Sequence, residues 1–330
     1  MKLSRLGEFG LIEKIASTTP KGHGVRIGIG DDAAWVRSKS GSYLISADLL
    51  LEGIHFDLRW TSLFALGYKS LAVNLSDIAA MGGIAAYLIL SVGIPVDFHS
   101  EDVEEFYRGI RSLAVKSGVA LVGGDTSAAT SLIISACVVG HAPYPPVRRK
   151  GAREGNDIYI TGSLGDSGLA LKLLRSHSSQ LPGKALAFLL RRHNKPTPRL
   201  AAGALLAKKR LATAMIDVSD GLLQDLDHIC HASGVGAVIW EDRLPLSPAY
   251  RALAGDDGNR FALAGGEDYE LLFCARRRHR AEIENLGKHV QVPITRIGRC
   301  IPASEGVRVF DTNRKLRVMQ TTGHDHFRVK

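Results

Sequence analysis

The sequence predicts a mixed α/β fold of the α+β type, divided into two domains. With 330 residues the chain is long enough for two domains of ordinary size, each with its own core. Short apolar runs of strand length alternate with segments in which the apolar residues have helical spacing. Three prolines fall within residues 143–146, where neither a helix nor a sheet tolerates them. We therefore expect an N-terminal domain over residues 1–145 and a C-terminal domain over residues 146–330.

The N-terminal half is expected to combine short strands with two long helices. Apolar residues at helical spacing predict a helix over Leu63–Met81. A second helix is expected over Glu101–Ser117, because Ser100 can cap it and acidic residues occupy its first turn. The apolar runs around these helices predict strands at Val25–Ile29, Tyr43–Ala47, Val119–Val122 and Leu132–Val139, the last two on either side of a turn at Gly123–Thr126.

The C-terminal half repeats this alternation after the prolines. A glycine-rich turn separates a strand at Asp157–Thr161 from a helix at Asp166–Leu174. The apolar run Ala212–Val218 predicts a strand, and helical spacing of apolar residues from Leu222 to Ile229 predicts the helix that follows it. Further strands are expected at Gly236–Trp240, Glu270–Ala275, Thr295–Cys300 and Val307–Phe310.

The charge balance narrows the expected partners. The chain has 42 Lys and Arg against 33 Asp and Glu, which gives a net charge of +9. Its basic runs at 148–150, 208–210 and 276–280 have no interleaved aromatic residues on which bases could stack, so we expect no nucleic-acid partner. No apolar run is long enough to span a bilayer, and Glu8 falls where a signal peptide would be apolar. These features predict a cytoplasmic protein without a membrane partner.

Carboxylates recur in five short stretches at the edges of apolar runs. Clustered carboxylates repel one another unless protons or cations lie between them, and Mg²⁺ prefers such oxygen ligands. No phosphate-binding loop with a Gly-Lys-Ser/Thr ending occurs, so metal ions would have to hold a nucleotide if the chain binds one. The stretches are Gly28–Asp32, Asn74–Asp77, Gly123–Thr126, Asp217–Gly221 and Gly265–Asp268.

Each stretch also has a simpler interpretation. Gly28–Asp32 partly matches a dinucleotide-binding fingerprint, but two aspartates stand where a phosphate-binding helix should begin, and a hairpin with an Asp-Asp turn is the alternative. Asn74 and Asp77 share a helix face, which could contact a ligand or form an exposed polar stripe. Asp220 could bind a ligand or cap the helix that follows it.

The order and spacing of these motifs resemble the thiamine-monophosphate kinase family, which belongs to the ATP-binding superfamily typified by aminoimidazole ribonucleotide synthetase. The resemblance extends from Gly7 to Phe327. It rests on Gly-Ile-Gly-Asp-Asp-Ala, Val-Asn-Leu-Ser-Asp-Ile-Ala-Ala-Met-Gly, Val-Gly-Gly-Asp-Thr, Ile-Asp-Val-Ser-Asp-Gly-Leu, Gly-Gly-Glu-Asp-Tyr-Glu-Leu and the terminal Asp-His-Phe.

The resemblance implies a fold, a reaction and an assembly. The fold would have an N-terminal sheet-and-helix domain that binds ATP and Mg²⁺ and dimerises, and a C-terminal α+β domain that completes the active site. The reaction would be direct, Mg²⁺-assisted transfer of a phosphoryl group from ATP to thiamine monophosphate, giving thiamine diphosphate. The partners would be these two substrates and a second copy of the chain.

The resemblance also assigns residues, of which Asp48, Asp125 and Arg149 would matter most for the transfer. It implies that several Mg²⁺ ions are bound by Asp31, Ser46, Ala47, Asp48, Asp77, Asp125, Asp217 and Asp220. It implies that ATP is bound by Tyr107, Gly124, Asp125, Arg149 and Ser219, and thiamine monophosphate by His55, Glu267 and Thr321. Two departures stand out. Ala47 replaces a threonine that is frequent in the family, leaving only a backbone oxygen, and Thr321 and His324 replace aromatic residues of the C-terminal motif.

Two other classes of function stay open. One is another ATP-dependent enzyme of the same superfamily, acting on selenide, a carbamoylated carrier or a purine precursor. The selenide enzyme needs a reactive cysteine near the N-terminus and the hydrogenase maturation enzyme a C-terminal one, whereas the first cysteine here is Cys137 and the last residue Lys330. The other class is a basic nucleic-acid-binding protein.

His324 and His326 lack a third ligand at metal-binding spacing, which favours packing or substrate binding over a transition-metal site.

Overall fold

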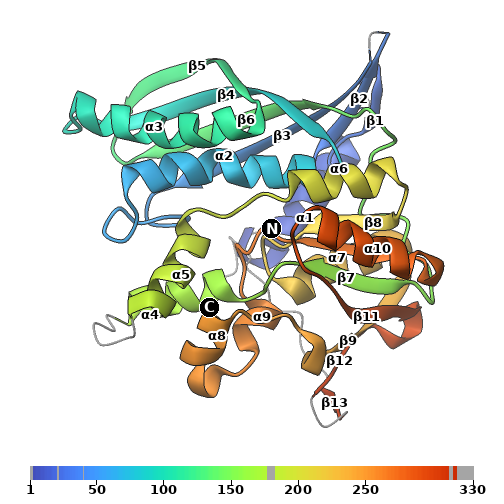
Figure 1. The fold of residues 1–330 in the computed structure, drawn as a ribbon. Helices are drawn as coiled ribbons and strands as arrows, with labels where there is room; N and C mark the ends of the chain where they lie inside the picture. Colours follow the sequence, from blue (N-terminus) through green and yellow to red (C-terminus); the bar gives the residue numbers. More distant parts are fainter. Residues whose placement is uncertain (1–2, 21, 40, 177–182, 312–314, 318–330) are drawn as a thin grey trace.

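The computed structural model has two β-sheets at opposite ends of the molecule, with helices packed between and around them (Figure 1). It describes residues 3–20, 22–39, 41–176, 183–311 and 315–317. The sheets have six and seven strands, and most strand pairs in both are antiparallel. The expected mixed α/β fold of the α+β type is confirmed.

Two helices cover one face of the N-terminal sheet. The strand order is β1-β2-β3-β6-β4-β5, and α3 is the crossover between the parallel strands β4 and β5. Helices α2 and α3 cross in backbone contact. A Cβ at Gly67 would lie 1.9 Å from the carbonyl oxygen of Phe106, so glycine permits this close crossing. The elements are α1 (Leu3–Thr18), β1 (Val25–Ile27), β2 (Ala34–Ser38), β3 (Gly41–Leu51), α2 (Leu63–Ala80), β4 (Ile84–Pro95), α3 (Ser100–Ser117), β5 (Ala120–Ala129) and β6 (Ile133–His141).

The opposite face of this sheet is open and apolar. Side chains alternate between the two faces of a strand, and the inward residues of β3 and β4 are buried under α2 and α3. The alternate residues are exposed, including Ile45 and Leu49 of β3 and Tyr87 and Ile89 of β4. The sheet therefore presents large apolar side chains that nothing in this chain covers among the described residues.

Two local predictions for this half are wrong. Strand β5 runs continuously through Gly123–Thr126, where a turn was expected, because its parallel pairing with β4 continues to Ala129. A Cβ at Gly124 would lie 1.7 Å from the Leu90 carbonyl oxygen, so glycine permits this close pairing. Helix α3 begins after His99, whose backbone N–H donates to Asp102 at 3.0 Å, and Ser100 is already its first residue.

The C-terminal sheet contains the six strands expected for this half, each to within two residues. Its order is β13-β12-β9-β11-β7-β10-β8, and only β12 and β9 are parallel. The elements are β7 (Asp157–Thr161), α4 (Asp166–Arg175), α5 (Gly183–Asn194), α6 (Leu200–Lys208), β8 (Ala212–Asp217), α7 (Leu222–Ser233), β9 (Val235–Trp240), α8 (Pro248–Leu253), α9 (Arg260–Ala264), β10 (Leu271–Ala275), α10 (Arg280–His289), β11 (Ile294–Pro302), β12 (Val307–Phe310) and β13 (Leu316–Arg317).

Helix α2 packs against both halves of the molecule. Its last residues, Ala79 and Ala80, share one buried apolar cluster with Leu206 and Ala207 of α6. A Cβ at Gly203 would lie 2.0 Å from the Ala79 carbonyl oxygen, so the two helices are in backbone contact. This joint fixes the end of α2 beside the end of β8. Among the described residues, no helix combines the length and apolarity required to cross a bilayer.

Candidate active site

Three carboxylates meet where the two halves of the chain touch. Asp77 lies in the last turn of α2, Asp217 ends β8, and Asp32 lies in the connection between the antiparallel strands β1 and β2. One carboxylate oxygen from each lies within 4.8 Å of the others. Asp32 and Asp217 are buried and Asp77 is partly buried. The aspartate cluster, defined as these three residues, is therefore built from distant parts of the sequence.

Burial and mutual repulsion make these carboxyls hold protons unusually tightly. Burial raises the pKa of Asp217 to about 7, and the nearby charge of Asp32 adds to the effect. Burial also raises the pKa of Asp77 well above its usual value, reinforced by Asp48 and Asp217. The pKa of Asp48, on β3, is raised by burial to about 6. A divalent cation would relieve both the burial of charge and the repulsion.

Arg149 closes one side of the aspartate cluster. Its Nη2 and Nε donate to Oδ1 of Asp32 at 2.7 and 3.1 Å, and its backbone N–H donates to Asp31 at 3.2 Å. Oδ2 of Asp32 is buried and has no hydrogen-bond partner in the described part of the chain. The cluster thus combines the guanidinium of Arg149, held by hydrogen bonds, with a buried carboxylate oxygen of Asp32 that has no hydrogen-bond partner in the described structure.

Strand β3 contributes to the cluster through one face only. Ser46 is buried, its hydroxyl donates to Oδ2 of Asp77, and Asp48 lies two residues further along the same face. Ala47 points to the open face of the sheet and is exposed. Any contribution of Ala47 to this site would have to come from its backbone.

A second acidic group follows β8. One ligand atom each of Asp220, Asp225 and His228 lies within 4.8 Å of the others. Asp225 accepts the backbone N–H groups of Asp220 and Gly221 at 3.2 and 3.0 Å, so it secures the start of α7. Asp220 is therefore not the cap of that helix, whose N-cap residue is Gly221.

The segment Gly265–Glu270 is held against this turn in a strained conformation. Glu267 and Tyr269 have φ values of 63° and 51°, which non-glycine residues rarely adopt. The backbone N–H of Glu267 donates to the Ser219 carbonyl at 2.7 Å, and that of Tyr269 to Val218 at 2.9 Å. These bonds place Glu267 directly beside Ser219.

Glu267 is kept ionised mainly by Lys69, because burial lowers the pKa of its other neighbour, His193, to about 4 and leaves that ring neutral at neutral pH. Nζ of Lys69, a residue only 3% exposed, lies 2.8 Å from Oε1, and Nδ1 of His193 lies 3.3 Å from Oε2. Burial alone would raise the pKa of Glu267, but Lys69 and His193 lower it below its usual value, with a further contribution from His55. Nδ1 of His55 accepts the backbone N–H of Leu51 at 3.0 Å, which fixes the ring at the end of β3.

Three predicted site residues lie away from the aspartate cluster within one chain. Strand register aligns Asp48, Ala136, Leu90 and Gly124 across four strands, so Gly124 lies three strand spacings, about 14 Å, from Asp48. Asp125 pairs with Ser91 and lies on the open apolar face, opposite to that of Asp48. Tyr107 follows Phe106, whose carbonyl contacts Gly67, and Gly67 is about 15 Å along α2 from Asp77. Thr321 lies outside the described residues.

Comparison with known proteins places this geometry in a family. Residues 30–142 match the N-terminal domain, and residues 153–310 the C-terminal domain, of AIR synthase related proteins. The thiamine-monophosphate kinase of Bacillus subtilis (strain 168) is 33% identical over 327 residues, which are 98% of this chain and 100% of that protein. That of Aquifex aeolicus (strain VF5) is 36% identical over 330 residues, covering 99% and 100%. The chain belongs to the thiamine-monophosphate kinase family.

Solved structures agree with this assignment. AaThiL complexed with AMPPCP and TMP has a TM-score of 0.87 and 35% identity, covering 99% of both chains. Thiamine-monophosphate kinase from Stenotrophomonas maltophilia K279a has a TM-score of 0.77 and 38% identity, covering 92% of this chain and 96% of that one. The hydrogenase maturation protein HypE of E. coli, at 20% identity and a TM-score of 0.70, shares the fold.

Asp32, Lys69 and His193 belong to this kinase-family site but were not among the predicted site residues. Asp32, rather than its neighbour Asp31, joins Asp77 and Asp217 in the aspartate cluster. Both aspartates are visible in the sequence, but only the turn geometry decides which side chain points inward. Lys69 and His193 carried no local signal, since each is one basic residue on a helix and becomes notable only through its contact with Glu267.

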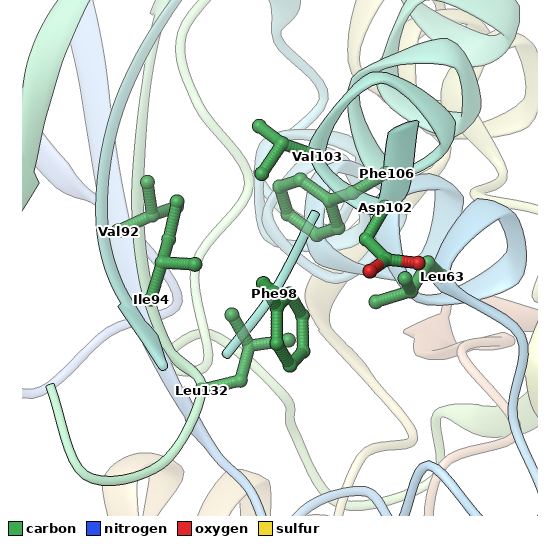
Figure 2. Close-up of a pocket in the computed structure, with 8 residues that line it drawn as sticks. All are labelled: Leu63, Val92, Ile94, Phe98, Asp102, Val103, Phe106 and Leu132. Carbon is green, nitrogen blue, oxygen red and sulfur yellow. The ribbon is translucent and has the colours of Figure 1, made fainter. Parts of the chain in front are cut away.

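The donor atoms of the aspartate cluster fit Mg²⁺. All are carboxylate oxygens, which hard divalent cations prefer, and one of them is buried without a hydrogen-bond partner in the described structure. By contrast, a small cavity beneath α3 is unsuited to any ligand. Figure 2 shows its lining of seven apolar side chains and Asp102, and its volume of about 10 Å³ is barely enough for one water molecule.

Proposed function

We propose that this chain transfers the γ-phosphoryl group of ATP to thiamine monophosphate, producing thiamine diphosphate and ADP. The observation that carries the proposal is its near full-length similarity, at 35% identity, to a structure that holds both AMPPCP and TMP. The aspartate cluster with Arg149 supports it, because phosphoryl transfer requires charge neutralisation and positioning more than covalent catalysis. The fold alone would leave the acceptor open, since HypE shares it.

Some residues at the cluster would bind the metal ion and others the phosphate groups. Asp32, Asp77 and Asp217 would hold Mg²⁺, which when bound neutralises phosphate charge. Arg149 would stabilise the phosphate oxygens with its charged hydrogen bonds. The predicted Mg²⁺ ligands Asp31, Ser46, Ala47, Asp48, Asp77, Asp125, Asp217 and Asp220 and the predicted ATP contacts Tyr107, Gly124, Asp125, Arg149 and Ser219 stay part of this proposal.

No general base is required for the attack. The second pKa of a phosphate monoester is about 6, so the acceptor oxygen is already ionised at neutral pH. Glu267 would bind the acceptor, because its ionised carboxylate complements the positive thiazolium ring of thiamine. His55, which is close enough to lower the pKa of Glu267, would line the same site. Thr321 is the third predicted contact.

The functional unit in this proposal is a homodimer formed through the open face of the N-terminal sheet. Exposed Ile45, Leu49, Tyr87 and Ile89 form an apolar surface of the kind that a subunit interface buries. Asp125 lies on that face and cannot reach the aspartate cluster of its own chain, so we propose that it acts in the partner's site. The proposed division into residues 1–145 and 146–330 is compatible with family matches that end at residue 142 and resume at residue 153.

The reaction is tested by measuring ADP and thiamine diphosphate together. Purified protein should form both in equal amounts from ATP, Mg²⁺ and thiamine monophosphate, and neither when Mg²⁺ or the acceptor is omitted. Nucleotide turnover without thiamine diphosphate would refute the acceptor. Steeply salt-dependent nucleic-acid binding with no turnover would favour the basic binding protein instead.

The shared site is tested by mixing two inactive variants. Asp125→Asn and Asp217→Asn subunits should each be inactive as homodimers, but a mixed dimer should contain one intact site if Asp125 acts across the interface. Random mixing should then restore roughly a quarter of wild-type activity, because half of the dimers are mixed and each has one of two sites. No recovery in demonstrated mixed dimers would place both residues in one chain's site, and a monomeric mass would refute the dimer.

A further inference from the structure

A second, larger pocket lies outside the aspartate cluster. It has a volume of about 650 Å³, within the range of small-molecule sites, and opens between α2, α3 and α5 and the segment around Pro245–Pro248. None of the described residues that line it belongs to the predicted metal, ATP or thiamine sites. The nearest link to those sites is Arg192, which lines the pocket next to His193, the partner of Glu267.

The lining of this pocket is strongly basic. Among the described residues that line it, five carry a positive charge and none is acidic. The five are Lys116, Arg191, Arg192, Lys195 and Arg199. Like charges gathered around one concavity repel one another, and an anion in the concavity would lower that cost.

Buried carboxylates neutralise only part of the positive charge of the lining. Glu270, which is fully buried, accepts from Nη2 of Arg192 at 2.8 Å and from Nε of Arg199 at 2.6 Å. Asp166 lies 3.5 Å from Nε of Arg192, and that Nε has no hydrogen-bond partner in the described structure. Asp268 also acts on the charge of Arg192. At most three carboxylates thus oppose five cations, which leaves an excess of at least two positive charges.

Two further cations of the lining, Arg191 of α5 and Lys195 just after that helix, are held by aromatic rings. The guanidinium of Arg191 lies 5.3 Å from the ring centre of Phe188, and Nζ of Lys195 lies 4.3 Å from that of Phe64. A ring orients a cation without removing its charge. In the described part of the chain neither residue forms an ion pair with a carboxylate, so both remain able to bind an anion.

The pocket also offers apolar surface next to these charges. Phe188, Leu246 and the prolines Pro245, Pro248 and Pro293 line it, together with the ring of Tyr68. A bare inorganic ion would leave this surface unused, whereas a phosphate ester with a ring would cover it. The volume of about 650 Å³ likewise exceeds what one phosphate group needs.

We infer that this pocket binds a small organic phosphate, with the phosphate held by Arg191, Lys195 and the Arg192–Arg199 pair and the organic part against Phe188 and Leu246. The site is separate from the proposed reaction, so its occupation does not depend on the phosphoryl transfer. Its position behind His193 places a bound ligand one residue away from a side chain that contacts Glu267.

The inference is tested by calorimetric titration of the full chain with phenyl phosphate in the presence of EDTA. Without divalent cations the aspartate cluster repels anions, so binding there is suppressed. One molecule should bind per chain, and Arg191→Gln/Lys195→Gln should weaken binding at least tenfold. Lys208→Gln/Lys209→Gln, which removes the same charge from an exposed surface, should leave the affinity within twofold. Inorganic phosphate should bind several-fold more weakly than phenyl phosphate.

Location is tested separately by modifying arginines with phenylglyoxal and mapping the products by mass spectrometry. Phenyl phosphate should protect Arg191 from modification, while leaving Arg278, exposed elsewhere, reactive. The inference is overturned if phenyl phosphate does not bind, if both double variants weaken binding equally, or if Arg191 is not protected. Equal affinity for inorganic phosphate would overturn the assignment of an organic ligand.

Discussion

Replacing Asp217 by Asn should stabilise the metal-free protein at neutral and alkaline pH while abolishing activity. Asp217 is 2% exposed, and its pKa is raised from 3.8 to about 7 by burial and by Asp32. Well below pH 3.8 the carboxyl is protonated in both folded and unfolded chains. As the pH rises to 7, the unfolded chain loses the proton first, so the free energy of unfolding falls. Asparagine is never charged and avoids this loss.

The size of the effect follows from the pKa difference. A rise from 3.8 to about 7 corresponds to up to about 4 kcal/mol by pH 8. Part of this is shared with Asp77 and Asp32, because the three carboxyls titrate together. The variant should therefore unfold at a higher urea concentration than the wild type at pH 8, and at a similar concentration at pH 4.

The assay is urea unfolding followed by circular dichroism in EDTA, at pH values from 4 to 8. Asp242→Asn, at an exposed position, is the control and should follow the wild type throughout. Saturating Mg²⁺ should reverse the order, because only the wild type retains the full set of ligands. A wild-type midpoint that does not fall with pH, or a variant that is less stable at pH 8 in EDTA, would refute the reasoning.

Other predictions test further parts of the site. Because metal binding ionises carboxyls that hold protons, adding Mg²⁺ to metal-free protein near pH 6.5 should release protons, measurable with a pH indicator; no release would contradict the raised pKa values. Lys69→Met should lower the free energy of unfolding by about 3–5 kcal/mol and raise KM for the acceptor, because it leaves the buried Glu267 carboxylate without its partner. Adding Glu267→Gln should recover the stability but not the affinity for the acceptor. Unchanged stability and KM would show that the ion pair is unimportant. Gly124→Ala should disrupt the pairing of β5 and lower the melting temperature by several degrees, whereas Gly123→Ala, with no atom near its added Cβ, should not; equal effects would contradict the packing.

Local pattern was enough to predict many elements of the fold. The strand Ala212–Asp217 and helix α7 were evident because apolar spacing changes from a continuous run to a helical period at Ser219–Gly221. The pattern failed at Gly123–Thr126, where two glycines suggest a turn and only pairing with a distant strand imposes an extended conformation. Propensity is a weak signal where tertiary pairing decides.

The site was predictable in composition but not in arrangement. The acidic motifs identified Asp77 and Asp217 as metal-ligand candidates, because clustered carboxylates repel one another unless protons or cations lie between them. That Asp125 lies on the other face of the sheet from Asp48 follows from strand order and register, neither of which a single sequence encodes locally. The same holds for Lys69, whose ion pair with Glu267 joins α2 to a segment almost 200 residues away in the sequence.

Helix α2 limits how this protein can admit a substrate. It carries Lys69 and Asp77 and is wedged between the N-terminal sheet and α6, with Ala79 and Ala80 fully buried and Gly203 in backbone contact. Separating the two halves would expose this apolar joint to water. The cost in free energy would be comparable to that of exposing part of a hydrophobic core. We therefore expect the two halves to stay in contact through this joint during the reaction. Substrates would then have to enter and leave without separation of the two domains.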